Sequence, residues 1–368
     1  MGTRLPLTSV VRNLPEMVPF VGPETFERRQ GRALRVRLGA NESVFGISPV
    51  AAEAMSAAAA KAWMYNDPEA YDLTEALAQA HGVPQTHVQV GAGIDELLGL
   101  LVRVFADVGE PVVMSDGSYP TFAYHVVGHG ARLVGVDYQN GHVDLAAMAD
   151  RARTEQARLV YMANPDNPMG SWCAARQIEH FVDAVGEDCI VILDEAYADF
   201  APTEAIVPVL PLRPNLVRTR TFSKAHGMAG ARVGYLLADP SIVEILGRVR
   251  NQFGVNRIAQ AGALASLSDA GFVHRVVESV TVGRQQLSAL AERLGLSCLP
   301  SATNFVNIDV GDGERARQIL QQLLERDIFV RMPSKPPGDR CIRVTIGHAE
   351  DHEILIDALA EILNGLPG

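Results

Sequence analysis

Short apolar runs alternate with longer amphipathic stretches along most of the chain. Small apolar residues recur with helical spacing over residues 50–62, and leucines do so over residues 95–108. Strands that alternate with helices predict a mostly parallel sheet with helices on both faces. The runs rich in Val, Ile and Leu that we expect to form its strands are residues 111–114, 132–136, 158–162, 189–193, 216–220 and 232–237.

The pattern changes after about residue 256. Long helical stretches there precede two β-branched runs, residues 305–308 and 341–346, which predict a smaller α+β domain. A chain of 368 residues also exceeds the usual size of a single core. The predicted division is an N-terminal arm packed on the small domain or a partner subunit (residues 1–33), a large domain (residues 34–255) and a small C-terminal domain (residues 256–368).

Composition excludes several classes of function. The net charge of -11 disfavours nucleic acid and anionic membranes as partners. No stretch approaches the roughly 20 apolar residues of a membrane span, and no signal peptide is recognisable, so we expect a cytoplasmic protein. The cysteines form no Cys-x-x-Cys pair, and the His125/His129 and His348/His352 pairs lack the Glu of a zinc-protease motif, so no metal site is expected.

Polar side chains follow three of the predicted strands. Residues 164–167, 194–197 and 223–224 each come just after an apolar run, and ligands of parallel sheets bind where strands end. Lys224 lies in a Ser/Gly/Ala-rich loop that leaves its amine accessible and partly desolvated, and Arg232 follows in the same segment. A nucleophilic amine beside a cationic site of phosphate size is what pyridoxal phosphate requires for a Schiff base.

Each neighbouring motif also has an ordinary structural explanation. Asp194 could protonate a pyridine nitrogen or cap the next helix. The turn at residues 164–170 could aim Asn167 at a ligand or be a simple tight turn. The glycine-rich turn at residues 91–96 lacks the third glycine of a dinucleotide fingerprint, so we expect its amides to bind a phosphate at a helix N-terminus. Phe122 could stack on a ring or belong to the core.

Taken together, these segments resemble the fold-type I pyridoxal phosphate aminotransferases, and most closely the histidinol-phosphate aminotransferase family. The similarity runs nearly from end to end. The segments that carry it are LGANE (38–42), YNDPE (65–69), GAGIDE (91–96), YPTF (119–122), NPDNPMG (164–170), DEAY (194–197), FSKAHGMAGARVGY (222–235), NFV (304–306) and IRVTIG (342–347).

The resemblance implies a pyridoxal phosphate-dependent transferase fold with a seven-stranded sheet, and pyridoxal 5'-phosphate bound covalently to Lys224. Lys224 would also move a proton on the substrate, Asp194 would pair with the pyridine nitrogen, and Asn167 and Tyr197 would bond the ring oxygen. The further cofactor contacts that it implies are Phe122 on the ring face, Ser223, Arg232 and the backbone of Gly93, Ile94 and Asp95 at the phosphate, and Tyr65 from the neighbouring subunit of a homodimer.

The same resemblance implies the substrate contacts. Arg343 would bind the α-carboxylate of the amino acid, with Asn41 nearby, and Arg331 matches an arginine suited to a phosphate or an acidic tail. Phe20 stands where the family has a tyrosine, which makes that wall of the substrate site more apolar. Ser43 and Val44 also depart from the family's Asn-Pro at these positions.

The implied activity is a two-stage transfer of an amino group between an amino acid, such as a histidinol phosphate-like donor or glutamate, and a 2-oxo acid. Such an enzyme would serve amino-acid metabolism, including histidine biosynthesis. An aromatic amino acid is the nearest rival substrate. The sequence also leaves open the decarboxylation of a phosphorylated amino acid and cofactor binding without turnover, although Lys224, Asp194 and Arg343 together disfavour a protein that only binds the cofactor.

Overall fold

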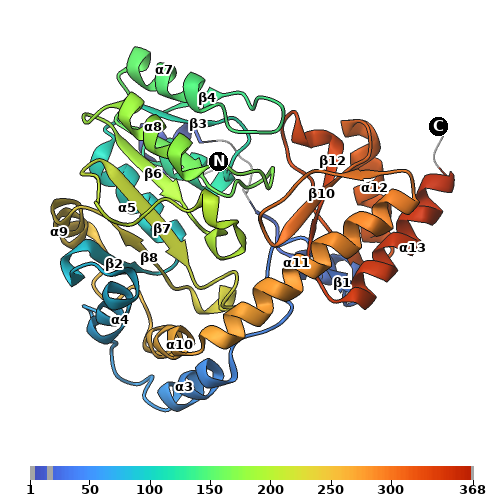
Figure 1. The fold of residues 1–368 in the computed structure, drawn as a ribbon, viewed down its shortest axis with the longest axis horizontal. Helices are drawn as coiled ribbons and strands as arrows, with labels where there is room; N and C mark the ends of the chain where they lie inside the picture. Colours follow the sequence, from blue (N-terminus) through green and yellow to red (C-terminus); the bar gives the residue numbers. More distant parts are fainter. Residues whose placement is uncertain (1–4, 15–19, 366–368) are drawn as a thin grey trace.

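The computed structural model describes residues 5–14 and 20–365. The large sheet has seven strands in the order β2-β8-β7-β6-β5-β3-β4 (Figure 1). Neighbouring strands from β7 to β4 are parallel, whereas β8 is antiparallel to both of its neighbours. The strands are β2 (Val88–Gly91), β3 (Pro111–Ser115), β4 (Arg132–Val136), β5 (Leu159–Ala163), β6 (Ile190–Asp194), β7 (Leu216–Thr221) and β8 (Gly234–Leu237).

The predicted α/β fold with a mostly parallel sheet is confirmed. Every apolar run assigned to this sheet contains a strand. Most of these strands are buried on both faces and so show no polar alternation, whereas β4 at the sheet edge has exposed residues at Arg132 and Gly135. The pattern missed β2, where only Val88 and Val90 are apolar and a glycine ends the strand. The seventh strand was therefore expected from the resemblance and not from the local sequence.

Helices cover both faces of this sheet (Figure 1). Val112 and Met114 of β3 pack in one core with α5, α6 and α9, whereas Val113 packs in another core with α7 and α8. This alternation follows from the two-residue repeat of a strand. The helices are α5 (Ile94–Phe105), α6 (Pro120–Gly128), α7 (Leu145–Glu155), α8 (Ala175–Val185) and α9 (Pro240–Val249).

Three further helices, α3 (Pro49–Ala59), α4 (Tyr71–His81) and α10 (Arg257–Ser268), pack together beside β2 and β8 (Figure 1). The core here joins Leu73 and Leu77 of α4 to Ala259 and Ala263 of α10. Helix α10 thus packs with segments from the first quarter of the chain, although the sequence pattern placed residues from 256 onward in the small domain.

The small sheet has three strands in the order β12-β10-β9, and long helices cover it (Figure 1). Its core includes Val36 and Leu38, and Val36 lies on β1, which pairs with β11. Val36 and Leu38 therefore belong to the same core as the C-terminal elements. The elements are α2 (Pro23–Gln30), β1 (Val36–Arg37), α11 (Ala270–Arg293), β9 (Ser297–Cys298), β10 (Phe305–Asp309), α12 (Gly313–Glu325), β11 (Ile328–Phe329), β12 (Cys341–Thr345) and α13 (Ala349–Gly365).

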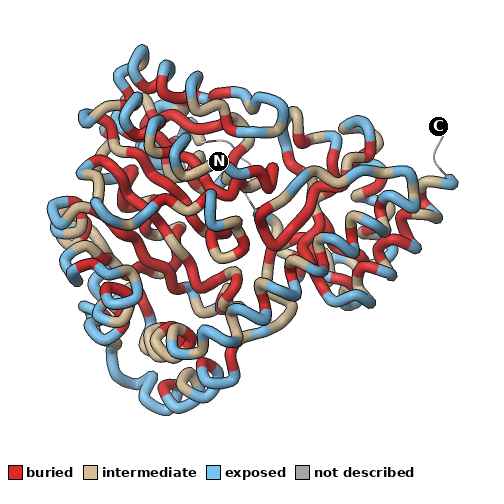
Figure 2. The backbone as a smooth tube through the Cα atoms, viewed as in Figure 1, coloured by how far each residue is buried: buried red, intermediate tan, exposed pale blue. Residues whose placement is uncertain are grey.

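The buried positions lie mainly on the strands and on the inner sides of the helices (Figure 2). Among the helices of the described ranges, none is long and apolar enough to span a bilayer. The remaining short elements are α1 (Ser9–Arg12) and 3-10 turns at Gln85–His87, Ala198–Phe200, Thr203–Ala205, Ala229–Ala231 and Gly338–Arg340.

Candidate active site

The carboxyl ends of β5, β6 and β7 bring the first site residues to one edge of the sheet. The backbone N–H of Asn164 donates to the carbonyl of Asp194 at 2.9 Å, so the turns after β5 and β6 are held side by side. Asp194 is 4% exposed, and its carboxylate accepts from Tyr161 Oη at 2.8 Å and from the N–H of Ala196 at 2.9 Å. Burial raises the pKa of Asp194 to about 6, although both hydrogen bonds oppose the rise. A buried carboxylate of this kind gains stability from a cationic partner, such as a protonated pyridine nitrogen.

Lys224 lies beside a hydrogen-bonded group of polar side chains. Its Nζ donates to the carbonyl of Asn41 at 3.0 Å and lies 5.5 Å from the ring centroid of Tyr197. Tyr197 Oη accepts from Asn41 Nδ2 at 3.0 Å and from Asn167 Nδ2 at 3.4 Å. The structure therefore brings together four of the predicted site residues, which come from distant parts of the sequence.

The loop that carries Lys224 needs a glycine at position 227. Gly227 has φ +70°, and a Cβ there would collide with the carbonyl oxygen of Gly46. The segment before α3 thus lies directly on the Lys224 loop, which limits the movement of both.

A phosphate-sized cradle lies at the N-terminus of α5. Among the described residues no side chain caps this helix, so its first N–H groups remain available to an anion. Arg232 Nη1 lies 3.5 Å from Ser223 Oγ, and Nη2 lies 3.6 Å from a carboxylate oxygen of Asp95. A Cβ on Gly93, whose φ is +83°, would collide with Arg232 Nη2. The donors and the missing Cβ fit the phosphate group of the expected cofactor.

Two arginines reach the site from the part of the chain that contains the small sheet: Arg343 lies on β12, and Arg331 follows β11. Arg331 and Arg343 are paired in an isolated antiparallel bridge, so their side chains leave the same face. Arg343 Nη1 donates to Asn167 Oδ1 at 2.6 Å, and this hydrogen bond connects the small sheet to the turn after β5 of the large sheet. Burial, and then the charge of Arg343, lowers the pKa of Arg331 to about 10, and burial also lowers the pKa of Arg343. Within the described ranges neither guanidinium has a carboxylate within 4.0 Å, so both are available to anionic ligands.

Two predicted residues lie apart from these hydrogen-bonded groups. Phe122 is fully buried and stacks on Tyr161 with a centroid distance of 4.4 Å, so its ring belongs to the core. Tyr65 is 78% exposed and stacks on Phe253, and no hydrogen bond described for this chain joins Tyr65 to Lys224. The side chain of Ile94 is buried in the core, as expected for a residue that offers only its backbone.

Sequence reasoning missed three residues that support the site. Tyr119 Oη donates to Asp95 at 2.7 Å, and Tyr161 donates to Asp194. Thr345 both accepts from the N–H of Asn41 and donates to its Oδ1. Tyr119 and Thr345 lie inside motifs that were recognised, whereas Tyr161 sits in an apolar run that gives no sign of its hydroxyl contact.

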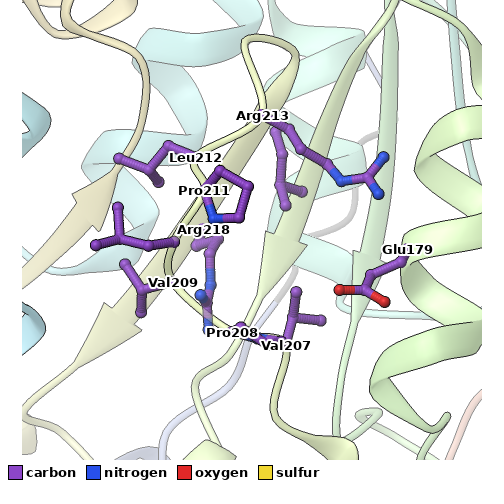
Figure 3. Close-up of a pocket in the computed structure, with 10 residues that line it drawn as sticks. Glu179, Val207, Pro208, Val209, Pro211, Leu212, Arg213 and Arg218 are labelled. Atoms are coloured by element: carbon purple, nitrogen blue, oxygen red, sulfur yellow. The ribbon is translucent and has the colours of Figure 1, made fainter.

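Behind Asp194, Glu195 forms a buried ionic cluster with two arginines. Arg218, 1% exposed, binds both carboxylate oxygens at 2.7 and 3.0 Å, and Arg220 binds one at 3.3 Å. Burial alone would raise the pKa of Glu195, but the two guanidiniums outweigh it and lower the pKa. Arg218 also lines a cavity of ≈ 70 Å³ under residues 207–213 (Figure 3), which contains none of the predicted site residues.

The chain has a large sheet with helices on both faces and a small second sheet, and an amine, a buried carboxylate and a phosphate cradle lie at one edge of the large sheet. This combination defines the class of pyridoxal phosphate-type transferases. The chain belongs to the class I and II aminotransferase family, whose model matches residues 35–359.

Known relatives narrow the comparison. The chain is 35% identical over 357 residues to histidinol-phosphate aminotransferase of Moorella thermoacetica, covering 96% of this chain and 92% of that protein. It is 37% identical over 357 residues to histidinol-phosphate aminotransferase of Anaeromyxobacter sp., covering 96% and 98%. The solved structure of histidinol-phosphate aminotransferase from Sinorhizobium meliloti in complex with pyridoxal-5'-phosphate is 43% identical, with a TM-score of 0.96 and full coverage of both chains.

Proposed function

We propose that the chain is a pyridoxal phosphate-dependent aminotransferase that takes its amino group from histidinol phosphate and passes it to a 2-oxo acid. The observation that carries this proposal is the pair Arg331 and Arg343. Two cations that face the same site without a carboxylate fit substrates that bring their own negative groups, such as a phosphate or a carboxylate. An enzyme for neutral aromatic side chains would need only one of them.

When bound, the cofactor supplies an electron sink that stabilises negative charge on the substrate Cα. Lys224 would hold it covalently and then carry the Cα proton on its amine. Asp194 would keep a proton on the pyridine nitrogen, and Tyr197 and Asn167 would donate to the ring oxygen. The phosphate would lie among the α5 amides, Ser223 and Arg232.

We also propose that the protein acts as a homodimer in which Tyr65 reaches the partner's site. The segment around Tyr65 exposes large aromatic side chains. Trp63 is 82% exposed and Tyr65 78%, and Phe253, stacked on Tyr65, is 46% exposed. Aromatic side chains gathered in this way are typical of buried interfaces.

A panel of amino donors tests the substrate. Holoenzyme should lose its visible cofactor absorbance when mixed with histidinol phosphate, and a 2-oxo acid should restore it. Histidinol without the phosphate should react with a kcat/KM lower by about one to two orders of magnitude, since a lost charge-assisted bidentate contact is worth roughly 1.5–3 kcal/mol. A higher kcat/KM with phenylalanine or tyrosine would favour an aromatic substrate, and release of carbon dioxide from a phosphorylated amino acid would favour decarboxylation.

A further inference from the structure

Phe20 and Val21 lie on the guanidinium of Arg331. The ring centroid of Phe20 is 3.9 Å from Cζ of Arg331, and the carbonyl of Val21 accepts from Nη2 at 2.6 Å. Phe20 is 51% exposed, so burial in a core does not hold its ring in place. The attraction between the cation and the ring face is therefore its main described contact.

These contacts leave most of the hydrogen-bonding capacity of Arg331 unused. Stacking occupies one face of the planar guanidinium, and Val21 uses only Nη2. Nε is buried and has no acceptor, and no residue in the described ranges accepts from Nη1. Phe329 lies further away, with its centroid 5.3 Å from Cζ. The plane of the guanidinium is thus fixed while its free N–H groups stay available in that plane.

We propose that Phe20 is a positioning residue. It holds the guanidinium of Arg331, and Arg331 binds the phosphate or acidic tail of the substrate. This inference rests on the proposed function and deepens it. A long arginine side chain loses rotamer freedom when it binds an anion, and a side chain that is already held loses less. A phenyl ring has no hydroxyl to offer the anion, so the effect of Phe20 on anion binding must pass entirely through the cation it holds.

Kinetics of the holoenzyme test this role. Phe20→Leu keeps an apolar side chain but removes the ring, and Phe20→Tyr keeps the ring. Phe20→Leu should raise KM for histidinol phosphate about twofold to thirtyfold, the equivalent of one cation–π contact. It should leave kcat within about twofold, because the chemistry at Cα is untouched. Phe20→Tyr should stay close to the original enzyme.

A second measurement does not depend on histidinol phosphate being the substrate. Inorganic phosphate should inhibit turnover of an amino acid with an uncharged side chain, and Phe20→Leu should raise its inhibition constant by a similar factor. In an Arg331→Met background, Phe20→Leu should have no further effect on either quantity, since the two residues act as one unit.

Three results would overturn the role of Phe20: an unchanged inhibition constant, an equal rise in KM for charged and uncharged donors, or an undiminished effect in the Arg331→Met background. An enzyme that ignores histidinol phosphate would instead contradict the proposed substrate, and the inhibition constant of phosphate would still decide the role of Phe20.

Discussion

Arg343 connects the small sheet to the large sheet and is also placed to bind the substrate. Its guanidinium donates to Asn167, and no carboxylate of the described residues lies within 4.0 Å of it. A substrate carboxylate would therefore be its ionic partner. Arg343→Lys removes the planar fork and should raise KM for glutamate at least about tenfold, while the cofactor stays bound. The control is Arg340→Lys, which alters a half-exposed ion pair with Asp309. Loss of cofactor in parallel with the rise in KM, measured by absorbance, would contradict this role.

Asp166 makes stability depend on pH. Its carboxylate is 1% exposed and accepts from Tyr138 Oη and the N–H of Met169, and burial raises its pKa to about 7. Between about pH 4 and pH 7 the folded state therefore binds more protons than the unfolded state, so the free energy of unfolding falls as the pH rises through this window.

Asp166→Asn removes this titration, because its amide can accept from Met169 and donate to Tyr138. The difference in free energy of unfolding between pH 5 and pH 8 should shrink by on the order of 2 kcal/mol in cofactor-free protein, measured by urea unfolding. Asp150→Asn, on the exposed surface, is the control. An Asp166→Asn protein with the original pH dependence would contradict the assignment.

At the scale of elements, the N-terminus of α5 carries the phosphate cradle. Gly93→Ala would put a Cβ against Arg232, in a backbone conformation (φ +83°, ψ 169°) that is almost confined to glycine, and should weaken binding of pyridoxal phosphate at least about tenfold. Gly109→Ala is a matched control, since Gly109 has φ +85° and no atom within 4 Å of a Cβ. Equal cofactor affinity in the two variants, by titration, would show that the cradle lies elsewhere.

Elements also mark where sequence reasoning succeeds. Strands β3, β5, β6 and β8 were predictable because each is an apolar run buried along nearly its whole length, whereas β4 at the sheet edge alternates between buried and exposed positions. The ends of β5, β6 and β7 located Asn167, Asp194 and Lys224. Strand β2 gives no such signal, because only Val88 and Val90 are apolar. A motif does not record the orientation of a ring either: Phe122 stacks on Tyr161 in the core, and its contact with a cofactor ring stays a prediction.

At the scale of the whole molecule, the substrate site forms where the small sheet packs beside the edge of the large sheet. Arg343 and Asn167 are 176 residues apart and meet only because β12 lies beside the edge of the main sheet. No local pattern encodes this contact, which is why the resemblance and not periodicity indicated the role of Arg343. The same limit applies to the partner subunit.

A hybrid experiment tests the proposed dimer. Lys224→Ala and Tyr65→Ala each damage a site, but a dimer of one subunit of each kind would have one site with neither change. Mixing the two inactive proteins after unfolding and refolding should recover about a quarter of the original activity, as expected for random pairing in a symmetric dimer. Tyr71→Ala, another exposed tyrosine, replaces Tyr65→Ala in the control mixture. No recovery would place Tyr65 in its own subunit's site, and full activity of the Tyr65→Ala protein by itself would place Tyr65 outside the site.

The covalent position of the cofactor is the most direct test of the whole account. Holoenzyme is reduced with borohydride, digested and analysed by mass spectrometry, so that the lysine joined to pyridoxal phosphate is identified. The account predicts the modification on the peptide that contains Lys224. Modification of Lys61 or Lys335 instead, or no modified lysine after saturation with pyridoxal phosphate, would contradict it.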